Sequence, residues 1–297
     1  MIATGRAYAR AALVGNPSDG YGGAVLAITI RDFRAEVDLA YSNEPVIDAE
    51  ASALIEAAVA RFEASLSPTE QRAYRAACRT TIPRQVGLAG SSAILVATLR
   101  ALCELHGTVL DPDRLAELSF RAETEDIGYP AGGQDPYAQA HEGLVLMDFA
   151  ADGVGVERLD PSRLPRLFLA YRTDAWTASE SVHADLRSQI DRDGGTIGLA
   201  MSEMADLARE AGRRLRAGRG AEIGELMSAT FDLRRRIIDL DARHERMVDL
   251  ARDHDAHANF TGSGGAILGT VPPADAWPAL RSALEEDGCE VIELRVG

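Results

Sequence analysis

The residues best suited to chemistry lie in glycine-rich loops, where the backbone can approach a ligand closely. The most specific loop is GLAGSSA at residues 87–93, which runs directly into an apolar helical pattern. Ser91 and Ser92 then lie at or just inside a helix start, where free N–H groups and the helix dipole favour an anion. A serine hydroxyl there can also bind Mg²⁺ that carries phosphate. The same letters are equally typical of a serine that caps a helix after a turn.

A second segment, RAETEDIGYPAGGQDPY at residues 121–137, combines acidic residues with a glycine-rich loop. Asp135 in this loop could accept a proton from a substrate hydroxyl, and a glutamate of the preceding helix could hold Mg²⁺. Glu125 and Asp126 are better explained as part of a solvated helix face. For Asp135, the preceding Ala-Gly-Gly-Gln makes a plain surface role less suitable.

Two further loops are GNPSDGYGG at residues 15–23 and TGSGGA at residues 261–266. Taken alone, each is typical of a tight turn, and Asp19-Gly20 would then be turn chemistry. These loops become informative only through their order along the chain.

The composition excludes several kinds of site. The chain has 297 residues and a net charge of −15, and all its basic residues are arginines because the sequence contains no lysine. A lysine-dependent phosphate loop and a Schiff base are therefore excluded, and so acidic a chain argues against nucleic acid as a partner. The three scattered cysteines indicate reduced thiols, and no apolar run is long enough to cross a membrane. We therefore expect a cytoplasmic protein.

The elements that must position these loops mix helices and strands without regular βαβ alternation, so the expected fold class is α+β. Strands are predicted at residues 5–14, 24–39, 143–149, 166–171 and 289–296. Helices are predicted at residues 48–64, 69–79, 92–106, 112–126, 178–192, 197–217, 221–250 and 275–287, with Ser67-Pro68 and Asp111-Pro112 as two of their starts.

In this order, the loops resemble the motifs of the GHMP small-molecule kinases. The four segments that carry the resemblance are GRAYARAALVGNPSDGYGG, PRQVGLAGSSA, EDIGYPAGGQDPYAQAHEGLVLMDF and NFTGSGGA. They are most similar to the sugar-kinase branch, and within it to glucuronokinases. The resemblance implies a two-domain GHMP-kinase-like fold. Residues 1–158 would form an N-terminal domain with a left-handed βαβ unit, and residues 159–297 a ferredoxin-like α/β sandwich, with the active site in the cleft between them.

The resemblance also implies roles for individual residues. Asp135 takes the place of the catalytic aspartate, and Arg10 that of the basic residue that pairs with it. Ser92 and Glu123 take the places of Mg²⁺ ligands, with Glu125 as the fallback. The implied phosphate loop wraps ATP with the backbone N–H groups of Gly87, Leu88, Ala89, Gly90, Ser91, Ser92 and Ala93.

On the substrate side, Asp19 matches an acidic position that binds sugar hydroxyls in galactokinase-like members, and Asn16 lies in the same loop. The implied third-motif loop consists of Gly262, Ser263, Gly264 and Gly265. The sequence departs from the family pattern in three places. GLAGSSA has one residue more than the usual GLGSSA, Asn259 replaces a common lysine, and Asn16-Pro17 replaces the Glu-His of galactokinases, which argues against galactose.

The implied reaction transfers the γ-phosphoryl group of ATP, with Mg²⁺, to the anomeric hydroxyl of an acidic sugar such as D-glucuronate. Since there is no lysine, an arginine must hold the carboxylate, and Arg84 and Arg172 are candidates. The alternatives are a heptose-phosphate or other sugar kinase, or a catalytically silent relative that binds sugar and nucleotide. The expected partners are a sugar and ATP, and the expected state is a monomer or homodimer.

Overall fold

The computed structural model describes residues 1–47, 51–64, 72–150, 153–174 and 179–295. The chain divides into two compact units. Unit 1 comprises residues 1–9, 29–83 and 89–142, and unit 2 comprises residues 10–28, 84–88 and 143–297. The predicted domain boundary between residues 158 and 159 stays a prediction. No helix in these described ranges is both long enough and apolar enough to cross a membrane.

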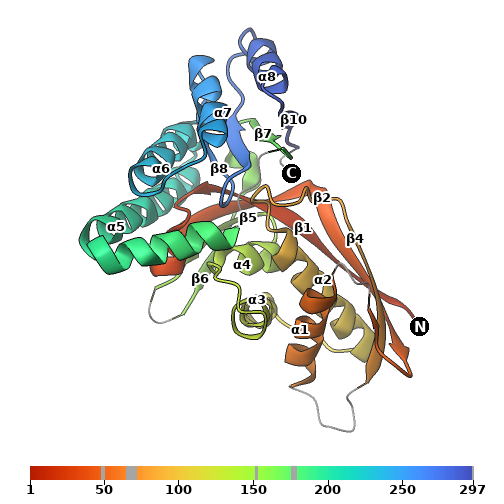
Figure 1. The fold of residues 1–297 in the computed structure, drawn as a ribbon. Helices are drawn as coiled ribbons and strands as arrows, with labels where there is room; N and C mark the ends of the chain where they lie inside the picture. The colour runs from red at the N-terminus through yellow and green to blue at the C-terminus, as the bar shows by residue number, and fades with distance from the viewer. Residues whose placement is uncertain (48–50, 65–71, 151–152, 175–178, 296–297) are drawn as a thin grey trace. The chain divides into compact units, whose positions relative to one another are not determined.

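Two long strands, β1 and β2, contribute residues to both units, and they pair with each other. Strand β1 is Ala3–Val14 and β2 is Ala24–Ser42, so both confirm the strands predicted at residues 5–14 and 24–39. Figure 1 shows them as the red and orange ribbons that begin the chain. Between them, Ser18–Tyr21 forms a 3₁₀ turn.

Unit 1 combines strands with a group of helices (Figure 1). Its elements are β3 (Val46–Ile47), α1 (Ser52–Glu63), β4 (Ala73–Thr80), α2 (Gly90–His106), α3 (Pro112–Arg121) and α4 (Gln134–His141). Strand β3 pairs in parallel with β4, with α1 between them in the chain, so the three form a βαβ unit. The cap of α3 is as predicted, since the Asp111 side chain accepts a hydrogen bond from the N–H of Arg114 at 2.8 Å.

The helix predicted at residues 69–79 is wrong, because β4 occupies most of this segment. Ala35–Ser42 of β2 pair antiparallel with Ala73–Thr80. Burial alternates here, with Tyr74 and Ala76 buried and Arg75 exposed. Alanine and arginine favour a helix in isolation, but a neighbouring strand with free hydrogen-bonding groups overrides such weak propensities. The predicted cap Ser67-Pro68 lies outside the described residues.

Unit 2 contains a sheet with helices packed on it (Figure 1). Its strands β7 (Leu167–Tyr171), β8 (Ala258–Phe260), β9 (Ala266–Thr270) and β10 (Glu290–Glu293) are antiparallel and lie in the order β10-β7-β9-β8. This order is the one that the predicted ferredoxin-like sandwich requires. Helices α6 (Ile223–Ile237), α7 (Ala242–Asp253) and α8 (Trp277–Glu286) share a core with it around Phe168, Phe231 and Phe260.

The helices of unit 2 differ from the predicted ones in where they break. A single helix, α5 (Ser179–Arg216), replaces the two predicted at 178–192 and 197–217. Gly194 and Gly195 lie within it, and a glycine costs only about 1 kcal/mol inside a helix. Conversely, α6 and α7 replace the one helix predicted at 221–250. Ile238 is extended there, and the Asp241 carboxylate accepts a hydrogen bond from the N–H of Arg243 at 2.9 Å, which starts α7.

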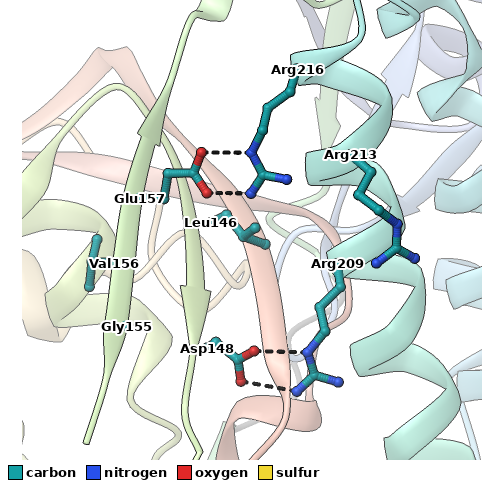
Figure 2. A pocket seen from close by; sticks show the side chains of 8 residues that line it. All are labelled: Leu146, Asp148, Gly155, Val156, Glu157, Arg209, Arg213 and Arg216. Carbon is teal, nitrogen blue, oxygen red and sulfur yellow. Dashed lines mark hydrogen bonds and ion pairs between the residues drawn. The ribbon is translucent and has the colours of Figure 1, made fainter.

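Helix α5 is attached to β5 (Leu144–Asp148) and β6 (Gly155–Leu159) by two arginine forks, as Figure 2 shows. Arg209 donates to both oxygens of Asp148, at 2.8 and 3.0 Å, and Arg216 donates to both oxygens of Glu157. These residues line a cavity of about 410 Å³. Because the pairs are partly exposed, each contributes roughly 0–1 kcal/mol, and we assign the cavity to helix packing.

Candidate functional site

The predicted phosphate loop leads into α2 in the way its letters indicate. Ala89 is the residue before the helix, in the left-handed conformation at φ 59°, and no side chain caps the helix. Ser91 and Ser92 therefore lie in the first turn, so the alternative in which a serine caps α2 is wrong. A helix start without a side-chain cap leaves its first N–H groups available to an anion.

A residue that the sequence did not single out holds this helix start within unit 1. The Gln139 side-chain amide donates to the carbonyl oxygen of Ala89 at 2.9 Å and to that of Tyr8 at 3.0 Å. Gln139 is 1% exposed and belongs to α4. A buried amide in a mostly polar helix was the available signal, but the sequence alone does not say which carbonyl such a group bonds.

The two residues predicted to bind Mg²⁺ lie together in unit 1. The Ser92 hydroxyl donates a hydrogen bond of 2.8 Å to Oε2 of Glu123, and both side chains are buried. Glu123 lies in a π-helical turn, Ala122–Asp126, that continues α3 where an ordinary helix was predicted to residue 126. Magnesium prefers oxygen ligands and is usually held by one or two protein groups plus phosphate and water. A hydroxyl beside a carboxylate fits that requirement.

Glu125, the fallback ligand, is used differently. Its carboxylate accepts from Arg61 at 2.6 Å and from Arg121 at 3.1 Å, and half of its side chain is exposed. These arginines hold the pKa of Glu125 below its ordinary value, chiefly through the hydrogen bond from Arg61. It therefore forms part of the solvated face that the acidic run also predicts, together with Asp126, which pairs with Arg61.

The sequence predicts a loop at Asp135, but the structure places this residue in a helix. Helix α4 begins at Gln134, so Asp135 is in its first turn, and its side chain is half-buried. The preceding Gly132 and Gly133 are buried.

In unit 2, Arg10 joins the start of the phosphate loop to the third-motif loop. It is 3% exposed, and its Nη1 donates to the carbonyl oxygens of Gly87, at 2.9 Å, and of Thr261. Its predicted pairing with Asp135 stays a prediction. These contacts assign Arg10 a structural role, because a buried guanidinium that donates to two carbonyl groups fixes both loops.

The third-motif loop is made of glycine where it meets the backbone of the phosphate loop. A Cβ atom on Gly262 would lie 2.5 Å from the carbonyl oxygen of Gly87, and one on Gly265 would lie 2.8 Å from Cα of Val86. The Thr261 hydroxyl also donates to the Gly87 carbonyl at 3.0 Å. Two of the motifs seen in the sequence, far apart in the chain, are thus brought together within unit 2.

The predicted substrate loop is anchored beside them. The Asn16 amide donates to the carbonyl oxygen of Phe260 at 3.1 Å. The Asn259 amide donates to Oδ1 of Asn16 at 3.1 Å and to the carbonyl oxygen of Leu13 at 3.0 Å. Asn259, which replaces a common lysine, therefore holds Asn16 in place. Asp19 follows in the 3₁₀ turn and is 5% exposed.

The two arginines predicted to meet a substrate carboxylate have different surroundings. Arg84 is exposed, and its role stays a prediction. Arg172 is buried, but its fork is occupied by Asp174 at 2.9 and 3.0 Å and by Asp287 at 2.7 Å.

A third arginine, Arg234 in α6, is 1% exposed, and its Nε and Nη1 have no hydrogen-bond partner in the described part of the chain. The sequence contained a signal for it. Arg234 continues the buried stripe of Ile223, Met227 and Phe231 at helical spacing.

The chain is similar to known proteins over most of its length. The GHMP kinases N terminal domain matches residues 53–143. The chain is 32% identical to glucuronokinase 1 of Arabidopsis thaliana over 95% of its own length and 88% of that protein. It is 33% identical to the probable glucuronokinase 2 of the same plant, over 95% of this chain and 87% of that one.

Among solved structures, a similar one is the phosphomevalonate kinase of Streptococcus pneumoniae in complex with phosphomevalonate and AMPPNP. The TM-score is 0.83 with 17% identity, over 98% of this chain and 99% of that chain. At that identity the likeness shows the fold alone. The extent and the level of identity to the two plant proteins show more, namely that this chain belongs to the GHMP kinases.

Proposed function

We propose that this kinase transfers the γ-phosphoryl group of ATP to the anomeric hydroxyl of an acidic sugar, D-glucuronate or a close analogue, giving the sugar 1-phosphate. The observation that carries the proposal is the buried pair of Ser92 and Glu123 at the uncapped start of α2. It combines oxygen ligands for Mg²⁺ with free N–H groups for phosphate. Sequence identity of 32% to a plant glucuronokinase and 33% to a probable one, each over 95% of this chain, supports a sugar as the acceptor.

The proposed reaction needs little covalent chemistry from the protein. The sugar hydroxyl oxygen forms a bond to the γ-phosphorus, the bond from that phosphorus to the β–γ bridging oxygen breaks, and ADP leaves with the electron pair. Asp135 accepts the hydroxyl proton. Ser92 and Glu123 would hold Mg²⁺, which would supply positive charge against the phosphates. Positioning and charge stabilisation supply most of the rate in such reactions.

On the sugar side, the buried Asp19 is proposed to accept hydrogen bonds from hydroxyl groups. Its loop is held by Asn16 and Asn259, which bond backbone carbonyls of both neighbouring segments. Arg10 keeps Gly87 and the third-motif loop together, so that the phosphate side and the sugar side of unit 2 are rigidly connected. Pre-set positions of this kind reduce the entropy lost when substrates bind.

One experiment tests the proposal directly. The purified protein is incubated with ATP, Mg²⁺ and a panel of sugars that includes glucuronate, galacturonate, glucose, galactose and a heptose phosphate, and ADP release is followed. We expect the highest kcat/KM with glucuronate and a product whose phosphate is at the anomeric carbon by ³¹P NMR. Preference for a neutral sugar or for the heptose phosphate would replace the proposed substrate, and no turnover with any sugar would contradict the activity.

A further inference from the structure

A buried cation in unit 2 has two donor atoms without a hydrogen-bond partner in the described residues. Arg234 is among the largest fully buried side chains of the described residues. Its Nε and Nη1 are each buried and have no hydrogen-bond partner in the described ranges. Leaving a buried charged donor unsatisfied is costly, and native proteins rarely do so without reason.

The surroundings of Arg234 hold its guanidinium in place without neutralising it. The guanidinium carbon lies 5.2 Å from the ring centre of Phe260, which itself packs edge-on against Phe231 at 5.3 Å. The ring of Phe260 thus contacts the guanidinium and attracts its charge. A planar guanidinium is suited to recognising a carboxylate through two parallel hydrogen bonds.

Arg234 keeps its positive charge in this buried position. Burial and the positive charge of Arg10 lower the pKa of Arg234 to about 10, and the negative charge of Asp19 partly opposes this. At that pKa the side chain stays protonated at neutral pH. Asp19, whose negative charge acts on Arg234, belongs to the proposed sugar side of the site.

We infer that Arg234 binds the carboxylate of the acidic sugar and thereby selects acidic over neutral sugars. This inference rests on the proposed function and assigns its substrate specificity to one residue. A carboxylate brought to Arg234 supplies an acceptor for the two unsatisfied donors, Nε and Nη1. Because only 1% of the side chain is exposed, water competes little for the same donors.

The test replaces Arg234 by methionine, which keeps an unbranched apolar stem and removes the charge. D-glucuronate and D-glucose serve as probes, since they differ only at C6, where one has a carboxylate and the other a hydroxymethyl group. We expect R234M to lower kcat/KM for glucuronate on the order of 100-fold and to change that for glucose less than about threefold. The matched control is R236M, which removes an exposed arginine of the same helix and should leave both values unchanged.

Thermal unfolding supplies a readout that a structural role would move in the opposite direction. Without sugar, R234M should have a Tm equal to or above that of the wild type, because it removes an unpaired buried charge. Glucuronate should raise the Tm of the wild type and not that of R234M. A lower Tm for R234M without sugar, with equal losses on both sugars, would identify a structural arginine and overturn the inference.

The remaining outcomes separate the two proposals. If R234M does not fold, R234K keeps the charge but loses the fork, and its KM for glucuronate should rise while that for glucose stays constant; equal values to wild type would overturn the inference. If the wild type prefers glucuronate and R234M keeps that preference, the result contradicts the role of Arg234 but not the proposed function. A wild type that neither binds nor phosphorylates glucuronate contradicts both.

Discussion

At the scale of single residues, the polar groups of this kinase differ in how they are satisfied. Ser92 and Glu123 bond each other in a buried position, whereas Glu125, two residues away, is exposed and bonded to two arginines. The same residue type therefore has two environments within one turn. A buried carboxylate beside a hydroxyl groups two kinds of oxygen ligand for a cation, whereas arginine neighbours compete with a cation for the carboxylate.

The metal assignment predicts different responses from these two glutamates. E123Q should raise the Mg²⁺ concentration needed for half-maximal activity at least tenfold, because a neutral amide oxygen is a weaker ligand than a carboxylate. E125Q, the matched control, should leave it within about twofold, since it changes only partly exposed ion pairs. Titration of Mg²⁺ at saturating ATP measures both. A larger effect from E125Q would move the metal to the fallback position.

The assignment of Asp135 as proton acceptor predicts that D135N lowers turnover without weakening the binding of ATP. We expect kcat to fall by roughly 10²–10⁴, as for removal of a general base, with the Kd of ATP near that of the wild type. D32N, which changes an exposed aspartate of unit 1, is the control. Activity measurements and calorimetric titration with ATP check both quantities. If D135N keeps full activity, another group accepts the proton.

The site residues that could be predicted from the sequence are those that belong to a local sequence motif. Ser92 and Glu123 occur in motifs with a fixed local context, and the structure brings them together. Arg234 and Gln139 act through partners more than 100 residues or several elements away. A sequence pattern shows that such a residue is buried, but burial alone does not say which charge or carbonyl it meets.

At the scale of elements, pairing with a neighbouring strand determined the structure of a segment whose sequence is compatible with either a helix or a strand. The segment that ends in β4 has helix-forming residues, yet it is a strand because β2 offers it eight paired positions. In the other direction, α5 continues through Gly194 and Gly195 because the residues on both sides favour a helix. Strands with clear apolar runs, such as β5 and β7, were predicted within a residue or two.

The packing of two motif loops predicts opposite effects for two glycine substitutions. G262A should lower the free energy of unfolding by roughly 1–3 kcal/mol and reduce activity, because its methyl group would overlap the carbonyl oxygen of Gly87, 2.5 Å away. G198A, the control, adds a methyl group in open space on α5 and should raise stability by up to about 1 kcal/mol. Urea unfolding measures both. A neutral G262A would mean that the loops can separate freely.

At the scale of the whole molecule, arginine is the only residue type that balances the carboxylates with a permanent positive charge. The chain has no lysine, and its arginines form two-pronged pairs with carboxylates, as between Arg209 and Asp148 or Arg243 and Asp241. Acidic residues still exceed basic ones, which gives the net charge of −15. The fold class and the order of motifs could be predicted from the sequence because they depend on pattern, whereas the charge balance of each buried site depends on tertiary contacts.

The alkaline limit of the fold gives a prediction for the molecule as a whole. Cys289 is 6% exposed in the core of the β10-β7-β9-β8 sheet, and burial raises the pKa of its thiol from 9.0 to about 12. A raised pKa means that the folded state holds the proton more tightly than the unfolded state. Its contribution is therefore complete below pH 9 and is lost progressively as the pH rises toward 12.

Replacing Cys289 by valine removes this titration while keeping an apolar side chain. Between pH 8 and pH 10.5 the free energy of unfolding of the wild type should fall by ~1–3 kcal/mol more than that of C289V. The comparison uses the difference between the two slopes, because every other titrating group is common to both proteins. Urea unfolding at half-unit pH steps gives the slopes. Parallel curves would show that the Cys289 thiol ionises in the folded protein as easily as in the unfolded chain, and hence that the sheet opens to solvent at this point.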